Sequence, residues 1–145
     1  MFALDVSGNV NVSGTITTNN VAIGTVVSGS WLAPTYASST CQACFSLTVS
    51  QGTWFIFGSV IFNAASAGAY VYSSVGPSAA NIYQSGMAGY NRTLMNVVAG
   101  QYVSIASQNV IVCSTTTTLY LVGMANSTTG AWANDGNGFQ AVKIC

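Results

Sequence analysis

The sequence predicts an all-β protein, with an N-terminal extended β-repeat arm followed by a jelly-roll (β-sandwich) head. Apolar and polar residues alternate with a period of two in segments such as 45–49, as in a half-buried strand. Turn-forming residues separate such segments at short intervals. No segment combines the apolar period of a helix with capping residues over a normal helical length.

Residues 1–35 are predicted to form the arm and residues 36–145 the head. VSGNV at 6–10 returns as VSGTI at 12–16, and a period of six suits short extended segments. Two copies bury too little surface to be stable alone, so we expect another chain or a particle surface to cover them. Pro34 biases Ala33 toward extended geometry and marks the junction. The residues predicted to attach the arm to sister chains or to a particle are Val6, Val10, Val12, Ile16, Val21 and Ile23.

The head reads as seven or eight consecutive strands, which is typical of a sandwich or jelly roll. Turns are expected at 50–52, 76–77 and 99–100. The run 54–62 is almost continuously apolar, so it is either buried on both faces or placed at a subunit contact. The longer run 54–72 could be mistaken for a membrane span. Its glycines and polar residues, with many β-branched and aromatic residues, favour buried strands and a turn instead. The expected strands are 45–49, 54–62, 70–75, 94–98, 102–106, 110–113, 115–124 and 140–144.

Charge is nearly absent from the chain. Only Asp5, Arg92, Asp135 and Lys143 are charged, which is 3% of residues, where an average protein has about 25%. The formal net charge is zero, and a net charge near zero promotes association. We therefore expect a subunit of a permanent assembly. Two basic residues are too few to neutralise several phosphates, so no nucleic-acid partner is expected.

Catalysis is not expected from this set of residues. The chain has no His and no Glu, which excludes a His-based triad, a His-containing zinc site and a Glu general base. A hydrolase would have to combine Asp5 with Asp135 from opposite ends of the chain. The segment NDGNG at 134–138 resembles the start of a calcium loop, but Gln140 stands where an acidic residue should close it. A hairpin turn is expected there instead, and no metal or cofactor is predicted.

The four cysteines, Cys41, Cys44, Cys113 and Cys145, leave several interpretations open. The C-x-x-C spacing of the first two suits a redox dithiol, but no helix is predicted to follow it. A zinc site would need the two isolated cysteines as well. Buried thiols or structural disulfides are the alternatives, with Cys44 and Cys145 a candidate pair.

Three aromatic residues lie in polar or glycine-rich surroundings that predict exposed loops. Tyr83 and Tyr90 lie in NIYQSGMAGYNR, together with Arg92, and Trp132 lies in GAWANDG. Rings displayed on loops stack on sugars or anchor protein contacts. These four residues are the candidate receptor contacts, and burial of the rings in a trimer interface is the alternative.

Several segments resemble known proteins. LTVSQGTWFIFGSVIFNA is similar to the central strands of tumour-necrosis-factor and complement-type jelly-roll heads. GQYVSIASQN, TTTTLYLVGMAN and GNGFQAVKIC resemble the last strands of bacteriophage tail-fibre and head-fibre tips of that fold. LDVSGNVNVSGTIT resembles the repetitive shaft that leads into such tips. The resemblance implies a homotrimer.

These observations lead to a functional hypothesis: a non-enzymatic structural protein on the surface of a phage virion, synthesised in the host cytoplasm. It would serve as a head fibre, a capsid decoration protein or a tail-fibre tip. Its expected partners are its own copies, other virion proteins and a host-surface glycan or protein, with no membrane insertion. A free carbohydrate-binding, lectin-like module is the alternative, and a hydrolase that uses Asp5 or Asp135 is a third hypothesis.

Overall fold

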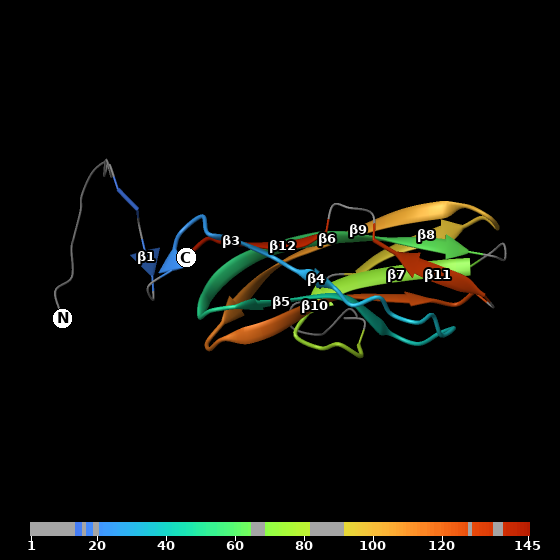
Figure 1. Cartoon of the computed structure of the whole chain (residues 1–145), viewed down its shortest axis with the longest axis horizontal. Coiled ribbons are helices and arrows are strands. Elements are labelled where there is room, and N and C mark those ends of the chain that lie inside the picture. Colours follow the sequence, from blue (N-terminus) through green and yellow to red (C-terminus); the bar gives the residue numbers. More distant parts are fainter. Residues whose placement is uncertain are drawn as a thin grey trace.

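The computed structural model describes residues 14–15, 17–18, 21–64, 69–81, 92–127, 129–134 and 138–145. Within these ranges every regular element is a β-strand, and two five-stranded antiparallel sheets face each other (Figure 1). The prediction of an all-β fold is confirmed. In the same ranges, no helix is long and apolar enough to cross a membrane.

The first sheet has the strand order β4-β5-β10-β7-β8. Strands β5 and β10 pair with Leu47 opposite Leu119, and a register shift follows at Leu121/Val122. Strand β10 pairs with β5 and β7, from which other strands separate it in the sequence, whereas β4 and β5, and also β7 and β8, are consecutive. The chain crosses between the sheets through short connections such as 50–51 and 114–116. The strand bounds are β4 Ser30–Trp31, β5 Gln42–Val49, β7 Ala69–Gly76, β8 Arg92–Val97 and β10 Thr117–Ala125.

The second sheet is built around one long strand, β6. Strand β9 pairs along one edge of β6, from Gly52 opposite Cys113 to Asn63 opposite Tyr102. Strand β12 pairs with the first half of β6 and β11 with the last residues, and β3 pairs with β12. The bounds are β3 Val26–Ser28, β6 Gly52–Ala64, β9 Tyr102–Cys113, β11 Gly130–Ala133 and β12 Phe139–Lys143.

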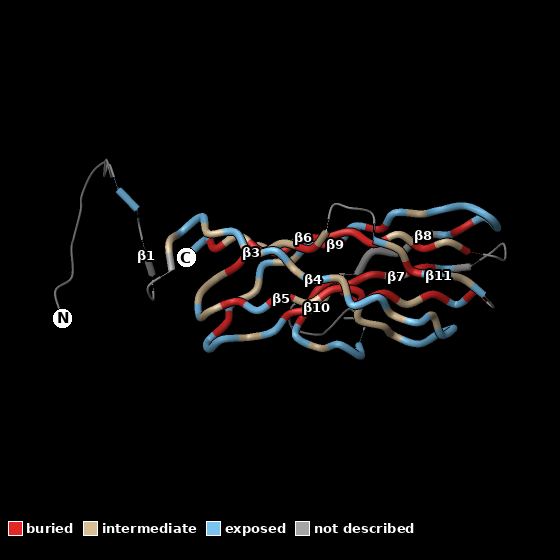
Figure 2. The backbone as a smooth tube through the Cα atoms, viewed as in Figure 1, coloured by how far each residue is buried: buried red, intermediate tan, exposed pale blue. Residues whose placement is uncertain are grey.

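The core lies between the two sheets, and buried residues alternate with less buried ones along much of the strands (Figure 2). Trp54, the largest fully buried side chain, donates a hydrogen bond from Nε1 to the Ser50 carbonyl oxygen at 2.9 Å. Burial of apolar area stabilises the fold by about 25 cal/mol per Å². The other large buried apolar side chains include Phe45, Ile56, Phe62, Ile105, Leu119, Leu121 and Phe139.

The predicted strands at 102–106 and 110–113 are a single strand, β9. The polar residues 107–109 do not interrupt it, because each keeps its register partner on β6. Ser107 points inward, and its hydroxyl lies 2.6 Å from that of Ser73 on β7, so the buried polar group is satisfied. The four-residue strand β11 was not predicted, since so short a segment carries no periodic signal.

The arm and the head divide differently from the prediction. Strands β1 (Thr17–Thr18) and β2 (Val21–Ala22) form a two-stranded sheet beyond one end of the sandwich (Figure 1). Strands β3 and β4 fall within the predicted arm, yet they pair with β12 and β5 of the head. The sandwich therefore begins at Val26. Four predicted attachment residues, Val6, Val10, Val12 and Ile16, lie outside the described residues.

The run 54–72, weighed as a membrane span, contributes β6 and the start of β7 instead. The expected turns at 50–52 and 99–100 are present, and Gly52 and Gly100 have φ angles of 142° and 76°. Such positive φ angles favour glycine, because it has no Cβ. The hairpin prediction at 134–138 is wrong. Strands β11 and β12 both pair with β6 and follow one another along the same strand.

Candidate functional site

The candidate site is the face of the second sheet that points away from the core. Along β9, alternate residues from Tyr102 to Val112 are exposed. Directly opposite residues of an antiparallel pair lie on the same face of the sheet. Because Phe55 is opposite Val110 and Phe57 is opposite Gln108, these side chains share the outer face.

A row of four apolar residues crosses this face from edge to edge. Val26 on β3 is opposite Val142 on β12, which is opposite Phe55 on β6, which is opposite Val110 on β9. Val26 is 56% exposed, Val110 53%, Tyr102 69% and Val112 76%. We name this surface the apolar face, consisting of Val26, Phe55, Phe57, Tyr102, Val110, Val112 and Val142.

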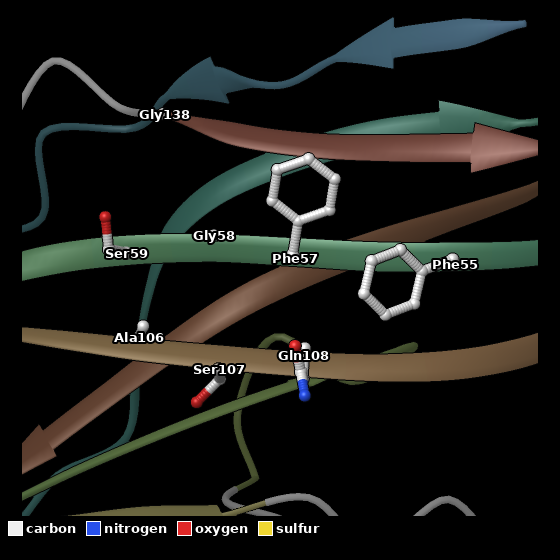
Figure 3. Close-up of a pocket in the computed structure, with 8 residues that line it drawn as sticks. All are labelled: Phe55, Phe57, Gly58, Ser59, Ala106, Ser107, Gln108 and Gly138. Carbon is white, nitrogen blue, oxygen red and sulfur yellow. The ribbon is translucent and has the colours of Figure 1, made fainter.

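A groove of about 460 Å³ lies on the apolar face. Phe55 and Phe57 project from β6 beside β12, and Gln108 lies on the adjacent strand β9 (Figure 3). The two ring centroids are 5.6 Å apart, with the planes tilted by 31°. The groove is also lined by Gly58, Ser59, Ala106, Ser107 and Gly138. It therefore offers two aromatic rings and one side-chain amide to whatever covers it.

None of the four charged residues of the chain belongs to the apolar face. Lys143 is opposite Trp54 and is fully buried, so its side chain lies on the inner side of the sheet. Arg92 begins β8 in the other sheet, and Asp5 and Asp135 lie outside the described residues. The seven residues of the apolar face carry no charge, so covering them desolvates no charged group of their own, and desolvating a charge is the costly part of burying a polar surface.

Trp132 is not displayed on a loop, and its prediction as an exposed receptor contact is wrong. It lies in β11 and is 7% exposed. The indole Nε1 donates a hydrogen bond to Gln42 Oε1 at 2.7 Å, and the ring packs against Phe62 with centroids 4.7 Å apart. The absence of a Cβ at Gly123 leaves room for the indole, so the core accepts this large side chain.

Only some of the other site residues predicted from the sequence lie within the described residues. Tyr83 and Tyr90 lie outside the described residues, and Arg92 begins β8 without a described side chain. Val21 pairs with Thr18 in the small two-stranded sheet. Ile23 follows it and is 39% exposed. Of the four predicted receptor contacts, the structure therefore describes only the side chain of Trp132.

All four cysteines are free thiols in the structure, so none of the candidate disulfides is formed. Cys113 is opposite Gly52 on one edge of β6, and the amide of Cys145 bonds to Thr53 O at the other edge. Two strand spacings separate these edges, or about 10 Å, which is too far for a disulfide without backbone movement. Among the described residues, no group of three or more His, Cys, Asp or Glu is placed to hold a metal.

The C-x-x-C segment lies at a strand, not at a helix N-terminus. Cys41 precedes β5, and its Sγ lies 3.8 Å from Met124 Sδ. Cys44 lies within β5, where burial raises the pKa of its thiol from 9.0 to about 12. Burial also raises the pKa of Cys113. A redox dithiol needs a lowered thiol pKa, so the arrangement favours the interpretation of Cys44 as a buried structural thiol.

No protein-family model, curated protein or solved structure matches this chain. The interpretation of the site therefore depends on its own geometry. Sequence reasoning did not identify the apolar face, although two signals for it exist. The run 54–62 was predicted to be buried or at a subunit contact, and residues 110–112 are all apolar, more than one face of a strand needs for the core.

Proposed function

We propose that this chain is a non-enzymatic structural protein on the surface of a phage virion, where it acts as a homotrimer with a jelly-roll head. The head would be a head fibre, a capsid decoration or a tail-fibre tip. The observation that carries the proposal is that the two ends of the elongated molecule differ. The N-terminal strands leave one end of an elongated sandwich, and the 99–100 turn lies at the opposite end (Figure 1). Such a molecule attaches at one end and displays the other.

The strand connections support a jelly-roll head. Strand β5 lies beside β10, and β6 lies beside both β12 and β9. Such neighbours, distant in sequence, are what the Greek-key connections of a jelly roll produce. The residue inventory supports a non-enzymatic role, since the chain offers no His and no Glu for proton transfer.

Peptide mass spectrometry of purified particles tests the proposal, using the phage that carries this coding sequence. We expect peptides of this chain to copurify with intact particles, and an antibody against the head to label them in electron micrographs. A chain found only in the particle-free fraction of the lysate would contradict the proposal.

The groove favours one other candidate, a free lectin-like module. Two aromatic rings beside a side-chain amide, Phe55 and Phe57 beside Gln108, suit stacking on a sugar and hydrogen bonding to it. A glycan array with the full chain tests this candidate. Binding that disappears in Phe57→Ala, by a protein that is absent from particles, would favour the lectin.

A further inference from the structure

We propose that the apolar face is the surface through which copies of this chain associate, and that its occupant is a second copy of the same chain. In the homotrimer, one part of the face of each copy would pack against a different part of the face of the next copy around the three-fold axis. This inference rests on the homotrimer of the proposed function and adds the location of its interface. The first argument is exposure. Val26, Val110 and Val112 each expose more than half of their surface, and contiguous exposed apolar patches mark interaction sites.

The second argument is size. The outer face of the second sheet, which contains the apolar face together with uncharged polar residues such as Ser104 and Gln108, covers roughly 600 Å². This value takes the 12 residues of β9 and three strand widths, at about 3.4 Å per residue and about 4.8 Å between strands. Side-chain relief increases the accessible area beyond this value. A standard interface buries about 800 Å² per partner. The face is therefore large enough for a stable subunit contact and larger than a small ligand needs.

The third argument is charge. A partner with a strongly charged surface would lose its hydration against this face and gain no opposite charge. A second copy presents the same uncharged residues, since none of the seven residues that form the apolar face carries a charge. Strand β9, at the sheet edge in the described part of the chain, also lacks the lysine or proline that usually guards such edges.

The fourth argument is direction. The strands of the apolar face run along the long axis of the sandwich, and the small sheet of β1 and β2 lies beyond one end of that axis (Figure 1). Copies packed through this face around an axis parallel to the strands bring their β1-β2 sheets to the same end. The contact through the apolar face is thus compatible with an assembly in which all copies point the same way.

The test compares the masses of two full-length variants by light scattering at micromolar concentration. V110K/V112K places two lysines on the apolar face, and T115K/T118K places two on exposed positions at and beside β10 of the other sheet. We expect the wild-type chain and the T115K/T118K control to have three times the 14.9 kDa chain mass. V110K/V112K is expected to have one third of that mass with an unchanged circular dichroism spectrum.

Cysteine labelling gives a second measurement, which does not require the fold to tolerate two introduced lysines. Labelling is measured at each site by peptide mass spectrometry, because the native Cys145 is exposed and reacts as well. Val112→Cys is expected to resist a maleimide in the native assembly and to react after dilution or mild denaturant, whereas Thr118→Cys reacts at once. A trimeric V110K/V112K with a reactive Val112→Cys would overturn the interface and leave the homotrimer standing. A monomeric wild-type chain would overturn both.

Discussion

At the scale of single residues, the contact between Gly123 and Trp132 shows how tightly the core is filled around the Trp132 ring. A Cβ at position 123 would lie 2.6 Å from the Trp132 ring. The ring is held in place by Phe62 and by its hydrogen bond to Gln42, so it has little freedom to move aside.

We therefore predict that Gly123→Ala destabilises the chain by about 1–3 kcal/mol, the usual cost of overpacking a core. The midpoint of urea unfolding, followed by tryptophan fluorescence, measures this effect. Gly14→Ala serves as the control, since nothing lies within 4 Å of a Cβ at that position. Equal midpoints for Gly123→Ala and the wild-type chain would mean that the ring adjusts freely.

Cys44 predicts a loss of stability at alkaline pH. Its pKa is about 12 in the folded chain, against an ordinary value of 9.0, because burial disfavours the thiolate. The unfolded chain therefore releases its proton first as the pH rises. The contribution of the protonated Cys44 thiol to the free energy of unfolding is fully present below pH 9.0. It falls between pH 9.0 and about pH 12, by up to about 1.4 kcal/mol per pH unit.

Cys44→Ala should flatten that alkaline decline. Urea midpoints at pH 8 and about pH 10.5 for the wild-type chain and Cys44→Ala measure the difference. Cys113 also has a raised pKa, so a smaller decline is expected to remain in the variant. Parallel pH profiles for the two proteins would show that the pKa of Cys44 does not differ between the folded and the unfolded chain.

At the scale of elements, β3 belongs to the sandwich even though its sequence continues the arm. Its neighbour Gly29 donates a backbone hydrogen bond to Phe139 O at 2.6 Å, and Lys143 N donates one to Thr25 O at 3.0 Å. Val27 packs against the core cluster. Strand β3 thus covers the edge of β12 that would otherwise be open.

We predict that a chain starting at Val21 unfolds at the same temperature as the full chain, if both are compared in the same oligomeric state. A chain starting at Trp31 lacks β3, loses several backbone hydrogen bonds worth about 1 kcal/mol each, and exposes the edge of β12 to aggregation. We expect its midpoint to be lower by several degrees in differential scanning calorimetry. If the two truncated chains unfold at the same temperature, β3 contributes nothing to the head.

At the scale of the whole molecule, the two sheets have different outer faces. The second sheet presents the charge-free apolar face, whereas the first presents hydroxyls such as Thr48 and Thr118, whose oxygens lie 3.1 Å apart across β5 and β10. One face is suited to contact with protein and the other to contact with water. With the arm at one end, this asymmetry orients each copy within the proposed trimer.

The amino-acid sequence by itself determined the fold class, the succession of strands and the scarcity of charge. These properties follow from local periodicity, turn residues and composition, which need no knowledge of distant contacts. The strand around Phe45 and the turns at Gly52 and Gly100 were predictable for this reason.

Only the tertiary structure decided which apolar residues face the core and which face outward. Trp132 stands among small and polar residues, yet pairing with β6 and the space beside Gly123 bury it. Phe55 and Val110 belong to apolar runs, yet register places them together on the outer face. Strand pairing likewise places Cys113 and Cys145 at opposite edges of β6. Burial depends on strand pairs that are distant in the sequence, and local pattern does not contain that information.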